Sequence, residues 1–210
     1  HTLGACRTGT RGRRPALSAT LKARFACRFS SMPDVSVERN GLPSADAFNA
    51  LPAGTRFDEL EIVRSLGIGG FGIVYLAHDH ALQRQIAIKE YMPGQLAWRD
   101  GGSGVSVRDA SLLETFELGR RSFVNEARLL ARFDHRSLLK VYRFWEANGT
   151  AYMAMPYLQG RNLRQVHQAM DGRPDEAWLL RLLLPVLEGL GLLHAAEVVH
   201  RDIAPDNILL

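Results

Sequence analysis

The stretch His200-Arg201-Asp202-Ile203-Ala204-Pro205-Asp206-Asn207-Ile208-Leu209-Leu210 decides the fold of this 210-residue chain. It places an acid, Asp202, shortly before an amide, Asn207, and an apolar run typical of a strand follows. A carboxylate can accept a proton, and an amide oxygen can bind a divalent cation. A lone His-Arg-Asp is more often a surface cluster of charges. The proline, the asparagine and the apolar run behind it argue against that reading.

A second motif lies upstream, in a glycine-rich segment. Gly67-Ile68-Gly69-Gly70-Phe71-Gly72-Ile73-Val74 fits the pattern G-x-G-x-x-G-x-V, in which glycines let backbone N–H groups approach phosphate oxygens. A dinucleotide-binding fold uses a similar pattern but needs a helix directly after the third glycine, whereas Ile73-Val74-Tyr75-Leu76 favours a strand. No Gly-Lys-Ser/Thr is present, which excludes a P-loop. A flexible hairpin without a ligand is the alternative if this motif is taken alone.

A lysine and a glutamate form a third candidate pair. Lys89 ends the apolar run Ile86-Ala87-Ile88, so a strand would bury its stem, and a buried ammonium needs a partner. Glu126 is the best candidate, because it lies on a predicted helix. Glu114 and Glu117 are nearer in sequence, but they fall before or at the start of that helix. In isolation, Lys89 would be taken as a solvated surface lysine.

The periodicity predicts a two-lobed α+β arrangement, with five antiparallel strands and one helix followed by a helical region. The helix is expected from about Phe116 to Phe133, and residues 92–115 are expected to be a long insert without a strong period. Asn148-Gly149 is expected to be a hairpin turn. The expected strands are Phe57–Leu66, Ile73–Ala77, Gln85–Tyr91, Leu139–Trp145 and Ala151–Tyr157.

The net charge of +4 does not indicate a nucleic-acid-binding face. Residues 1–31 hold seven basic and no acidic side chains, which leaves 19 of the 26 basic residues against all 22 acidic ones. We expect residues 1–31 to lie outside the fold; the alternative is an organellar targeting leader. Residues 32–56 are expected to be an irregular lead-in, residues 57–158 a first lobe with a hinge, and residues 159–210 part of a second lobe.

Both cysteines, Cys6 and Cys27, lie in the basic leader, so the body has no disulfide framework and a reducing, cytoplasmic setting is expected. No transmembrane helix is expected either. The most apolar stretch, residues 177–193, is interrupted by Arg181, Pro185, Glu188 and two glycines.

With these motifs in this order, the chain from Phe57 to Leu210 resembles a eukaryotic-type (Hanks-type) serine/threonine protein kinase. The long insert between Lys89 and Glu126 departs from the usual short connection and, with Tyr91-Met92-Pro93, resembles bacterial members. The resemblance implies ATP and Mg²⁺ as cofactors and a protein with a serine or threonine hydroxyl as substrate. Membrane attachment would require a region beyond Leu210.

The resemblance also implies a role for each site residue. Asp202 would accept the hydroxyl proton, Lys89 paired with Glu126 would bind phosphate, and Asn207 would hold Mg²⁺. Gly67, Gly69 and Gly72 would cover the phosphates. Val74, Ala87, Met155 and Leu209 would enclose the adenine, and backbone groups of Pro156 and Leu158 would bond to its edge.

Two positions depart from the family pattern. Ala204 stands where serine/threonine kinases usually have a lysine that reaches the transferred phosphate, and Asn162 stands where an acid often binds the ribose. The Asp-Phe-Gly motif with the second metal ligand is expected downstream of Leu210, so this piece is expected to be inactive alone, with uncovered apolar helix faces. The alternative function is a pseudokinase, a nucleotide-binding scaffold without transfer.

Overall fold

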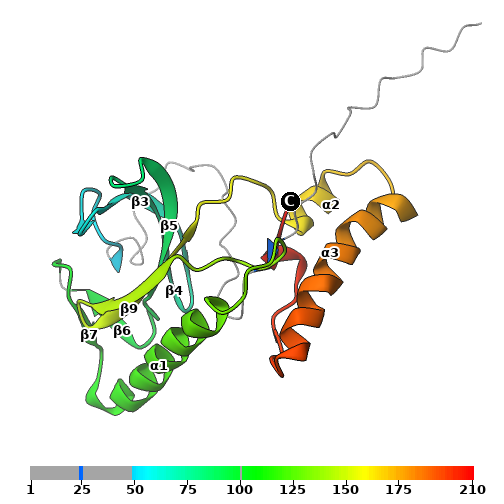
Figure 1. Cartoon of the computed structure of the whole chain (residues 1–210). Coiled ribbons are helices and arrows are strands. Elements are labelled where there is room, and N and C mark those ends of the chain that lie inside the picture. The colour runs from blue at the N-terminus through cyan, green and yellow to red at the C-terminus, as the bar shows by residue number, and fades with distance from the viewer. Residues whose placement is uncertain (1–23, 26–48, 100) are drawn as a thin grey trace, which may run out of the picture.

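A computed structural model describes residues 24–25, 49–99 and 101–210 and has two lobes. An antiparallel sheet and the long helix α1 (Leu113–Leu130) form the first lobe. Helices α2 (Leu163–Gln168) and α3 (Glu176–Ala195) form the second (Figure 1). The connection after the last strand of the sheet links the two lobes, which confirms the predicted two-lobed α+β arrangement.

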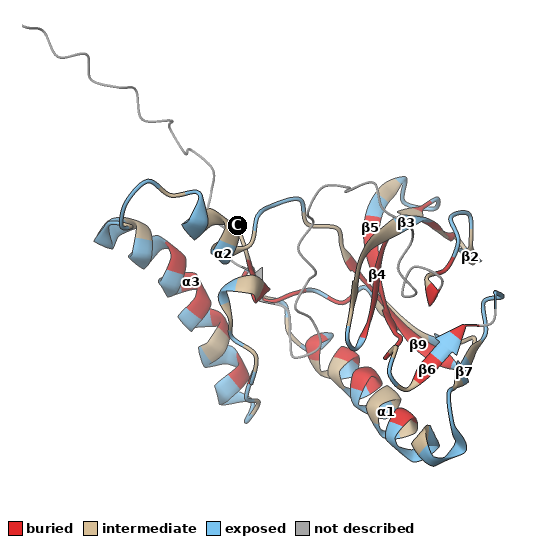
Figure 2. Cartoon of the chain, turned by 180° about the vertical axis from the view of Figure 1, so that it is seen from behind, coloured by how far each residue is buried: buried red, intermediate tan, exposed pale blue. Residues whose placement is uncertain are grey.

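The main sheet contains all five predicted strands and one addition. Its order is β2-β3-β4-β5-β9-β8, and every neighbouring pair is antiparallel. The middle strands are buried almost throughout (Figure 2). The strands span Arg56–Phe57 (β2, the addition), Leu60–Gly69 (β3), Gly72–Asp79 (β4), Arg84–Tyr91 (β5), Arg143–Ala147 (β8) and Thr150–Pro156 (β9).

The two ends of this sheet meet. The Phe57 ring of β2 lies 5.3 Å from that of Trp145 on β8, edge to face, and 4.6 Å from that of Tyr152. The Arg143 guanidinium on β8 pairs with the Glu59 carboxylate at 2.9 Å. These contacts join opposite edges, so the sheet is curled and its edge strands are protected.

The insert predicted at residues 92–115, without a strong period, contains short secondary structure that the sequence did not indicate. Strands β6 (Ala97–Arg99) and β7 (Val105–Val107) form a separate hairpin, and a 3-10 turn (Ala110–Leu112) leads into α1. The Asp109 carboxylate caps that turn by accepting a hydrogen bond from the Ser111 N–H at 2.8 Å. The helix therefore begins at Leu113, three residues before the predicted Phe116, and ends at Leu130 rather than Phe133.

One predicted strand begins later than expected. Strand β8 starts at Arg143, whereas the prediction placed its start at Leu139. Leu139 and Val141 are buried in the main core although they lie in an irregular segment. Their apolar alternation reflects that burial and not pairing in a sheet. The predicted turn is confirmed, since Asn148 and Gly149 have φ values of 55° and 75°.

The second lobe has a small core of its own, in which α3 packs against Leu138 and Ile208. The Asp175 side chain caps α3 by accepting a hydrogen bond from the Trp178 N–H at 2.7 Å. Much of the rest of α3 is exposed (Figure 2), and apolar side chains lie there, as expected. Its exposed leucines are Leu179, Leu180, Leu183, Leu184, Leu187 and Leu192.

Helix α3 is long and apolar enough to cross a membrane by length and composition, contrary to the sequence expectation. The buried core helix of a globular domain passes the same test. Leu182, Val186 and Leu193 of α3 belong to the second core, while 28 % of its most apolar window is buried.

Two residues of the basic leader take part in pairing. Arg24–Phe25 form β1, antiparallel to β10 (Ile208–Leu209). The segment 1–31 was expected to lie outside the fold, but these two residues pair with a strand of the domain. The rest of that segment, and the lead-in up to residue 48, lie outside the described residues.

Candidate active site

Four of the predicted site residues share one face of the sheet. Residues directly opposite each other in an antiparallel ladder point to the same face. Lys89 on β5 lies opposite Val74 on β4 and Met153 on β9. Ala87, two residues before Lys89, lies opposite Met155. Val74, Ala87, Lys89 and Met155 are therefore brought together, and all four are buried.

The glycine motif forms the hairpin between β3 and β4. Gly67 pairs with Val74 and Gly69 with Gly72, so a strand follows the third glycine and the dinucleotide-binding alternative is excluded. Gly72 approaches the neighbouring strand closely, because a Cβ at this position would overlap the carbonyl oxygen of Glu90. Phe71 is exposed at the tip of the hairpin.

The Lys89 side chain on β5 lies close to α1, the helix that carries Glu126. Lys89 is 6 % exposed, and its Nζ lies 5.7 Å from the centre of the Phe123 ring, one turn before Glu126 on α1. Burial raises the pKa of the Glu126 carboxyl, the Lys89 charge lowers it and the Asp202 charge raises it, which gives a pKa of about 7. The charges of Lys89 and Asp202 thus both change the pKa of Glu126, although the three residues come from distant segments.

The loop at 200–207 holds Asp202 by way of Asn207. The Asn207 amide donates hydrogen bonds to the Asp202 backbone oxygen at 3.1 Å and to its Oδ2 at 2.8 Å. Arg201, between His200 and Asp202, has a φ of 65°, in the left-handed region that non-glycine residues rarely adopt. Burial lowers the pKa of His200, which is 2 % exposed. The loop is therefore held in one shape by burial and by its own hydrogen bonds.

The same asparagine offers an oxygen for a metal ion. Asn207 is 4 % exposed, and its Oδ1 is buried and accepts no hydrogen bond within the described part of the chain. An unsatisfied buried acceptor is costly unless a cation or water binds there, and amide oxygens are ligands that Mg²⁺ accepts. The residue present therefore fits the Mg²⁺ expected at this position. Among the described residues, no group of three or more His, Cys, Asp and Glu side chains forms a further metal cluster.

The segment after the hinge pairs with the end of the chain. Arg161 and Leu210 exchange backbone hydrogen bonds of 3.3 and 3.0 Å, and Asn162 forms a bridge with Leu209. This pairing brings Leu209 beside the connection that follows Pro156 and Leu158, both of which are half-buried. The Asn162 side chain caps α2 by accepting a hydrogen bond from the Gln165 N–H at 2.8 Å, and its own N–H bonds to the Gln165 side chain. Asn162 thus acts as a helix cap.

Sequence reasoning missed two ion pairs near the site. Arg164 on α2 holds Asp206 with two hydrogen bonds of 2.6 and 2.7 Å, which sets a positive charge against the acid beside Asn207. Glu90, the residue after Lys89, forms a buried ion pair with Arg99 of the insert. No local pattern marks either pair: Arg164 and Asp206 are 42 residues apart, and Arg99 follows Glu90 by nine residues on a separate short strand.

Comparison with known proteins agrees with this geometry. The protein kinase domain family matches residues 60–210. The serine/threonine-protein kinase PknD of Chlamydia muridarum (strain MoPn / Nigg) is 29 % identical over 160 residues, covering 71 % of this chain and 15 % of that protein. The probable serine/threonine-protein kinase pknA2 of Bifidobacterium longum (strain NCC 2705) is 36 % identical over 149 residues, covering 71 % of this chain and 18 % of that protein.

Solved structures show the same fold. The apo form of PpkA-294 is 49 % identical, with a TM-score of 0.72, over 77 % of this chain and 57 % of that chain. The kinase domain of PknI from Mycobacterium tuberculosis is 25 % identical, with a TM-score of 0.57, over 77 % of this chain and 58 % of that chain. The chain thus spans less than a fifth of these two curated relatives and somewhat more than half of these solved domains. From its motifs, its fold and these matches, the chain belongs to the protein kinase domain family and resembles bacterial serine/threonine kinases of the Hanks type.

Proposed function

We propose that the protein containing this chain transfers the γ-phosphate of ATP to a serine or threonine hydroxyl of another protein. The observation that carries the proposal is geometric: buried Lys89 shares one face of the sheet with Val74, Ala87 and Met155. In the second lobe, Asn207 holds Asp202 by a hydrogen bond of 2.8 Å. The charges of Lys89 and Asp202 both act on Glu126, which supports a single site. A phosphate-binding lysine, its carboxylate partner and a candidate base are what phosphoryl transfer requires of side chains.

The nucleotide is assigned to the face of the sheet that carries Lys89. Val74, Ala87 and Met155 lie on that face, and the pairing of Leu209 with Asn162 supports Leu209 as the opposite wall of an adenine pocket. Backbone groups of Pro156 and Leu158 would bond to the adenine edge. The N–H groups of Gly67, Gly69 and Gly72 would cover the phosphates.

Asn207 would hold Mg²⁺ through its Oδ1. When bound, the ion neutralises charge on the phosphate oxygens. The Asn207 amide has a second task, because its N–H group donates to Asp202 Oδ2 and thereby orients the carboxylate.

In the transfer step, the acceptor hydroxyl oxygen forms a bond to the γ-phosphorus while the bond from that phosphorus to the β–γ bridging oxygen breaks and ADP leaves. The hydroxyl proton passes to Asp202. Asp202 Oδ1 accepts no hydrogen bond within the described part of the chain, whereas Oδ2 is held by Asn207, so Oδ1 is the oxygen assigned to the hydroxyl. Lys89 stabilises the charge on the phosphates, and Glu126 orients Lys89.

Ala204 is the observation that favours the second candidate, a pseudokinase that binds nucleotide without transfer. Its side chain has no cation to place on the transferred phosphate. The Arg164 guanidinium on Asp206 partly offsets this, because it compensates the acid that adjoins Asn207. We therefore keep transfer as the function. The absence of cysteines from the described body supports a reducing, cytoplasmic setting for the domain.

The test is transfer of label from γ-labelled ATP with Mg²⁺ to a protein acceptor, with the full-length protein that contains this chain and its Asp202→Asn variant. Asp202→Asn keeps the shape but removes the base, so binding of ATP and Mg²⁺ is retained and transfer falls at least 100-fold. ATP binding without transfer in the unchanged protein would establish the pseudokinase.

A further inference from the structure

A buried carboxylate lies directly behind the proposed phosphate-binding lysine. Glu90 follows Lys89 on β5, so its side chain points to the opposite face of the sheet, where it is 0 % exposed. Its Oε2 accepts a hydrogen bond from the Tyr75 hydroxyl at 2.6 Å, and its Oε1 accepts one from the Tyr152 hydroxyl at 2.9 Å. The Arg99 guanidinium completes the set with an ion pair to Oε1. Three side chains from β4, β9 and β6 therefore hold one residue of β5.

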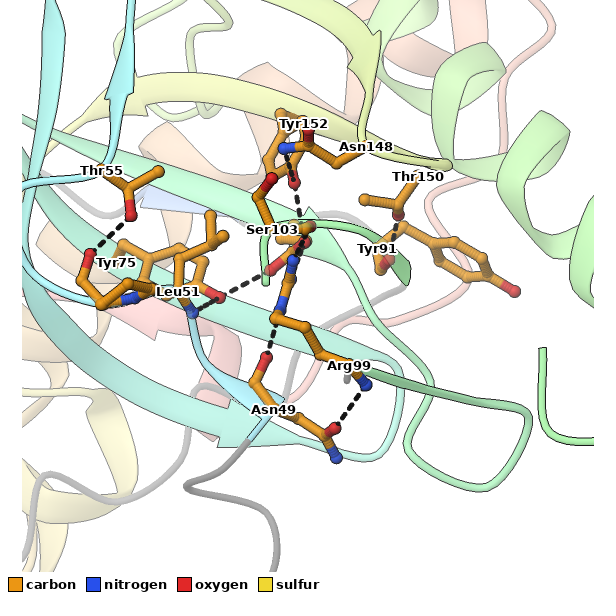
Figure 3. A network of polar contacts seen from close by, with 12 residues as sticks. Asn49, Leu51, Thr55, Tyr75, Tyr91, Arg99, Ser103, Asn148, Thr150 and Tyr152 are labelled. Atoms are coloured by element: carbon orange, nitrogen blue, oxygen red, sulfur yellow. Dashed lines mark hydrogen bonds and ion pairs between the residues drawn. The ribbon is translucent and has the colours of Figure 1, made fainter. Parts of the chain in front are cut away.

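Arg99 ties this carboxylate to two other segments. Its side chain is 1 % exposed, and its Nε donates to the Asn49 backbone oxygen at 2.9 Å. The Arg99 backbone N–H donates to the Asn49 side-chain oxygen at 3.0 Å, and the guanidinium also donates to the Ser103 backbone oxygen (Figure 3). The lead-in before the sheet and the insert hairpin are thus anchored at the strand that carries Lys89.

The two tyrosine hydroxyls and the Arg99 guanidinium of this cluster stay protonated. Burial raises the pKa of both Tyr75 and Tyr152, and the neighbouring Glu90 charge raises it further, so both hydroxyls stay neutral donors. Burial alone would lower the pKa of Arg99, but the Glu90 carboxylate outweighs it and the pKa is raised. Arg99 is the cation that balances Glu90 among the ion pairs of the described residues.

The residues around Glu90 transmit its position to the proposed active site. Lys89 precedes it, and consecutive Cα atoms are about 3.8 Å apart, so fixing one fixes the other. Tyr91 follows it and returns to the Lys89 face. There its hydroxyl donates to the Phe116 backbone oxygen of α1 at 3.2 Å, and its ring lies 6.0 Å from that of Phe123. Strand β5 is therefore clamped between the insert and the helix that carries Glu126.

We propose that Arg99 is a positioning residue for phosphoryl transfer: through Glu90 it fixes strand β5 and so sets where the Lys89 ammonium lies relative to Glu126 and the ATP phosphates. The inference rests on the proposed function of Lys89. The insert then contributes to catalysis, because it supplies the Arg99 guanidinium that holds Glu90.

The decisive variant is the double substitution Glu90→Gln with Arg99→Met in the full-length protein. It removes both buried charges together, so no unpaired ion is left to unfold the lobe, and any change in catalysis then reports positioning. The matched control is Glu59→Gln with Arg143→Met, which removes an ion pair that joins the edges of the same sheet. Arg99→Lys keeps the charge but loses the planar fork of donors, and it serves as the conservative variant.

We expect the double variant to unfold cooperatively near the wild-type temperature, with kcat reduced at least tenfold and KM for ATP raised. The control should keep the wild-type kcat and KM for ATP. For Arg99→Lys, both constants should lie between those of the wild type and those of the double variant. A second readout is the pKa of Glu126 followed by NMR, which should rise in the double variant as Lys89 moves away, because the Lys89 charge lowers it. A folded double variant with wild-type kcat, KM and Glu126 pKa would overturn the inference.

The kinetic constants and the Glu126 pKa together separate this inference from the proposed function. If the wild-type protein transfers no phosphate, the proposed function fails, and the Glu126 pKa still decides whether Arg99 positions Lys89. If the double variant does not fold, Arg99→Lys carries the test. Unchanged kinetic constants and an unchanged Glu126 pKa in that folded variant would also overturn the inference.

Discussion

The carboxylate of Glu126 lies close enough to that of Asp202 for the Asp202 charge to raise the pKa of Glu126, although one residue belongs to α1 and the other to the loop beside α3. This relationship joins the two lobes. The Lys89 charge lowers the same pKa. The pKa of Glu126 therefore responds to charges on both β5 and the loop at residues 200–207.

The raised pKa of Glu126 predicts a pH-dependent stability. Its folded value of about 7 lies above its ordinary value of 4.5, so the folded state disfavours the charged form. The contribution of this group is fully present below about pH 4.5 and is lost as the pH rises through 7. The free energy of unfolding of the wild-type protein, measured against Glu126→Gln, should therefore fall between pH 5 and pH 8. Urea titrations at several pH values test this, and a difference that is independent of pH would count against it.

Gly72 predicts a sharp contrast with its neighbour Gly70. A Cβ at position 72 would overlap the Glu90 carbonyl oxygen, whereas a Cβ at position 70 meets nothing within 4 Å. Gly72→Ala should therefore displace the hairpin from β5, raise KM for ATP by roughly tenfold and lower stability by about 1–3 kcal/mol. Gly70→Ala should change both by much less. Equal effects of the two substitutions on KM for ATP would refute the assignment of this hairpin to the phosphates.

Ala204 predicts a gain of activity. A lysine at this position would place a cation toward the transferred phosphate, and Arg164 already compensates the neighbouring Asp206. We expect Ala204→Lys to raise kcat several-fold while KM for ATP changes little, because the added charge acts on the transition state. Steady-state phosphate transfer measures this. An unchanged or lower kcat would show that the alanine is not the limiting feature.

The buried Glu90–Arg99 pair predicts a non-additive effect on stability. Arg99→Met leaves an uncompensated buried carboxylate and should cost about 3–5 kcal/mol, whereas the double variant with Glu90→Gln should recover most of that loss. Arg164→Met, which breaks the exposed pair with Asp206, should leave stability almost unchanged. Additive losses in the double variant, measured by denaturant unfolding, would mean that the two side chains stabilise the lobe independently.

The features that were predictable from the sequence are those with a local signature. Gly67–Val74, the strand lysine Lys89 and the Asn148-Gly149 turn each depend on a few adjacent residues. The helix that carries Glu126 was predictable because its apolar period is strong. The motif at residues 200–207 depends on residues so close in sequence that their spacing fixes their geometry.

The features that were not predictable depend on distant partners. Strands β6 and β7 have three residues each, too few to show a period, and Arg99 on β6 is held by Asn49 and Glu90. The apolar alternation at Leu139 and Val141 is typical of a strand, but here it serves packing in an irregular segment. In each case the tertiary contact decided the local structure.

The site assignment depends on Lys89, Glu126 and Asp202 forming one site, and the pKa of Glu126 tests this most directly. It can be followed by NMR in the full-length protein, in Lys89→Met and in Asp202→Asn, without nucleotide. Because the Lys89 charge lowers this pKa and the Asp202 charge raises it, the pKa should move above about 7 in Lys89→Met and below about 7 in Asp202→Asn. A Glu126 pKa that is the same in all three proteins would contradict the proposed site.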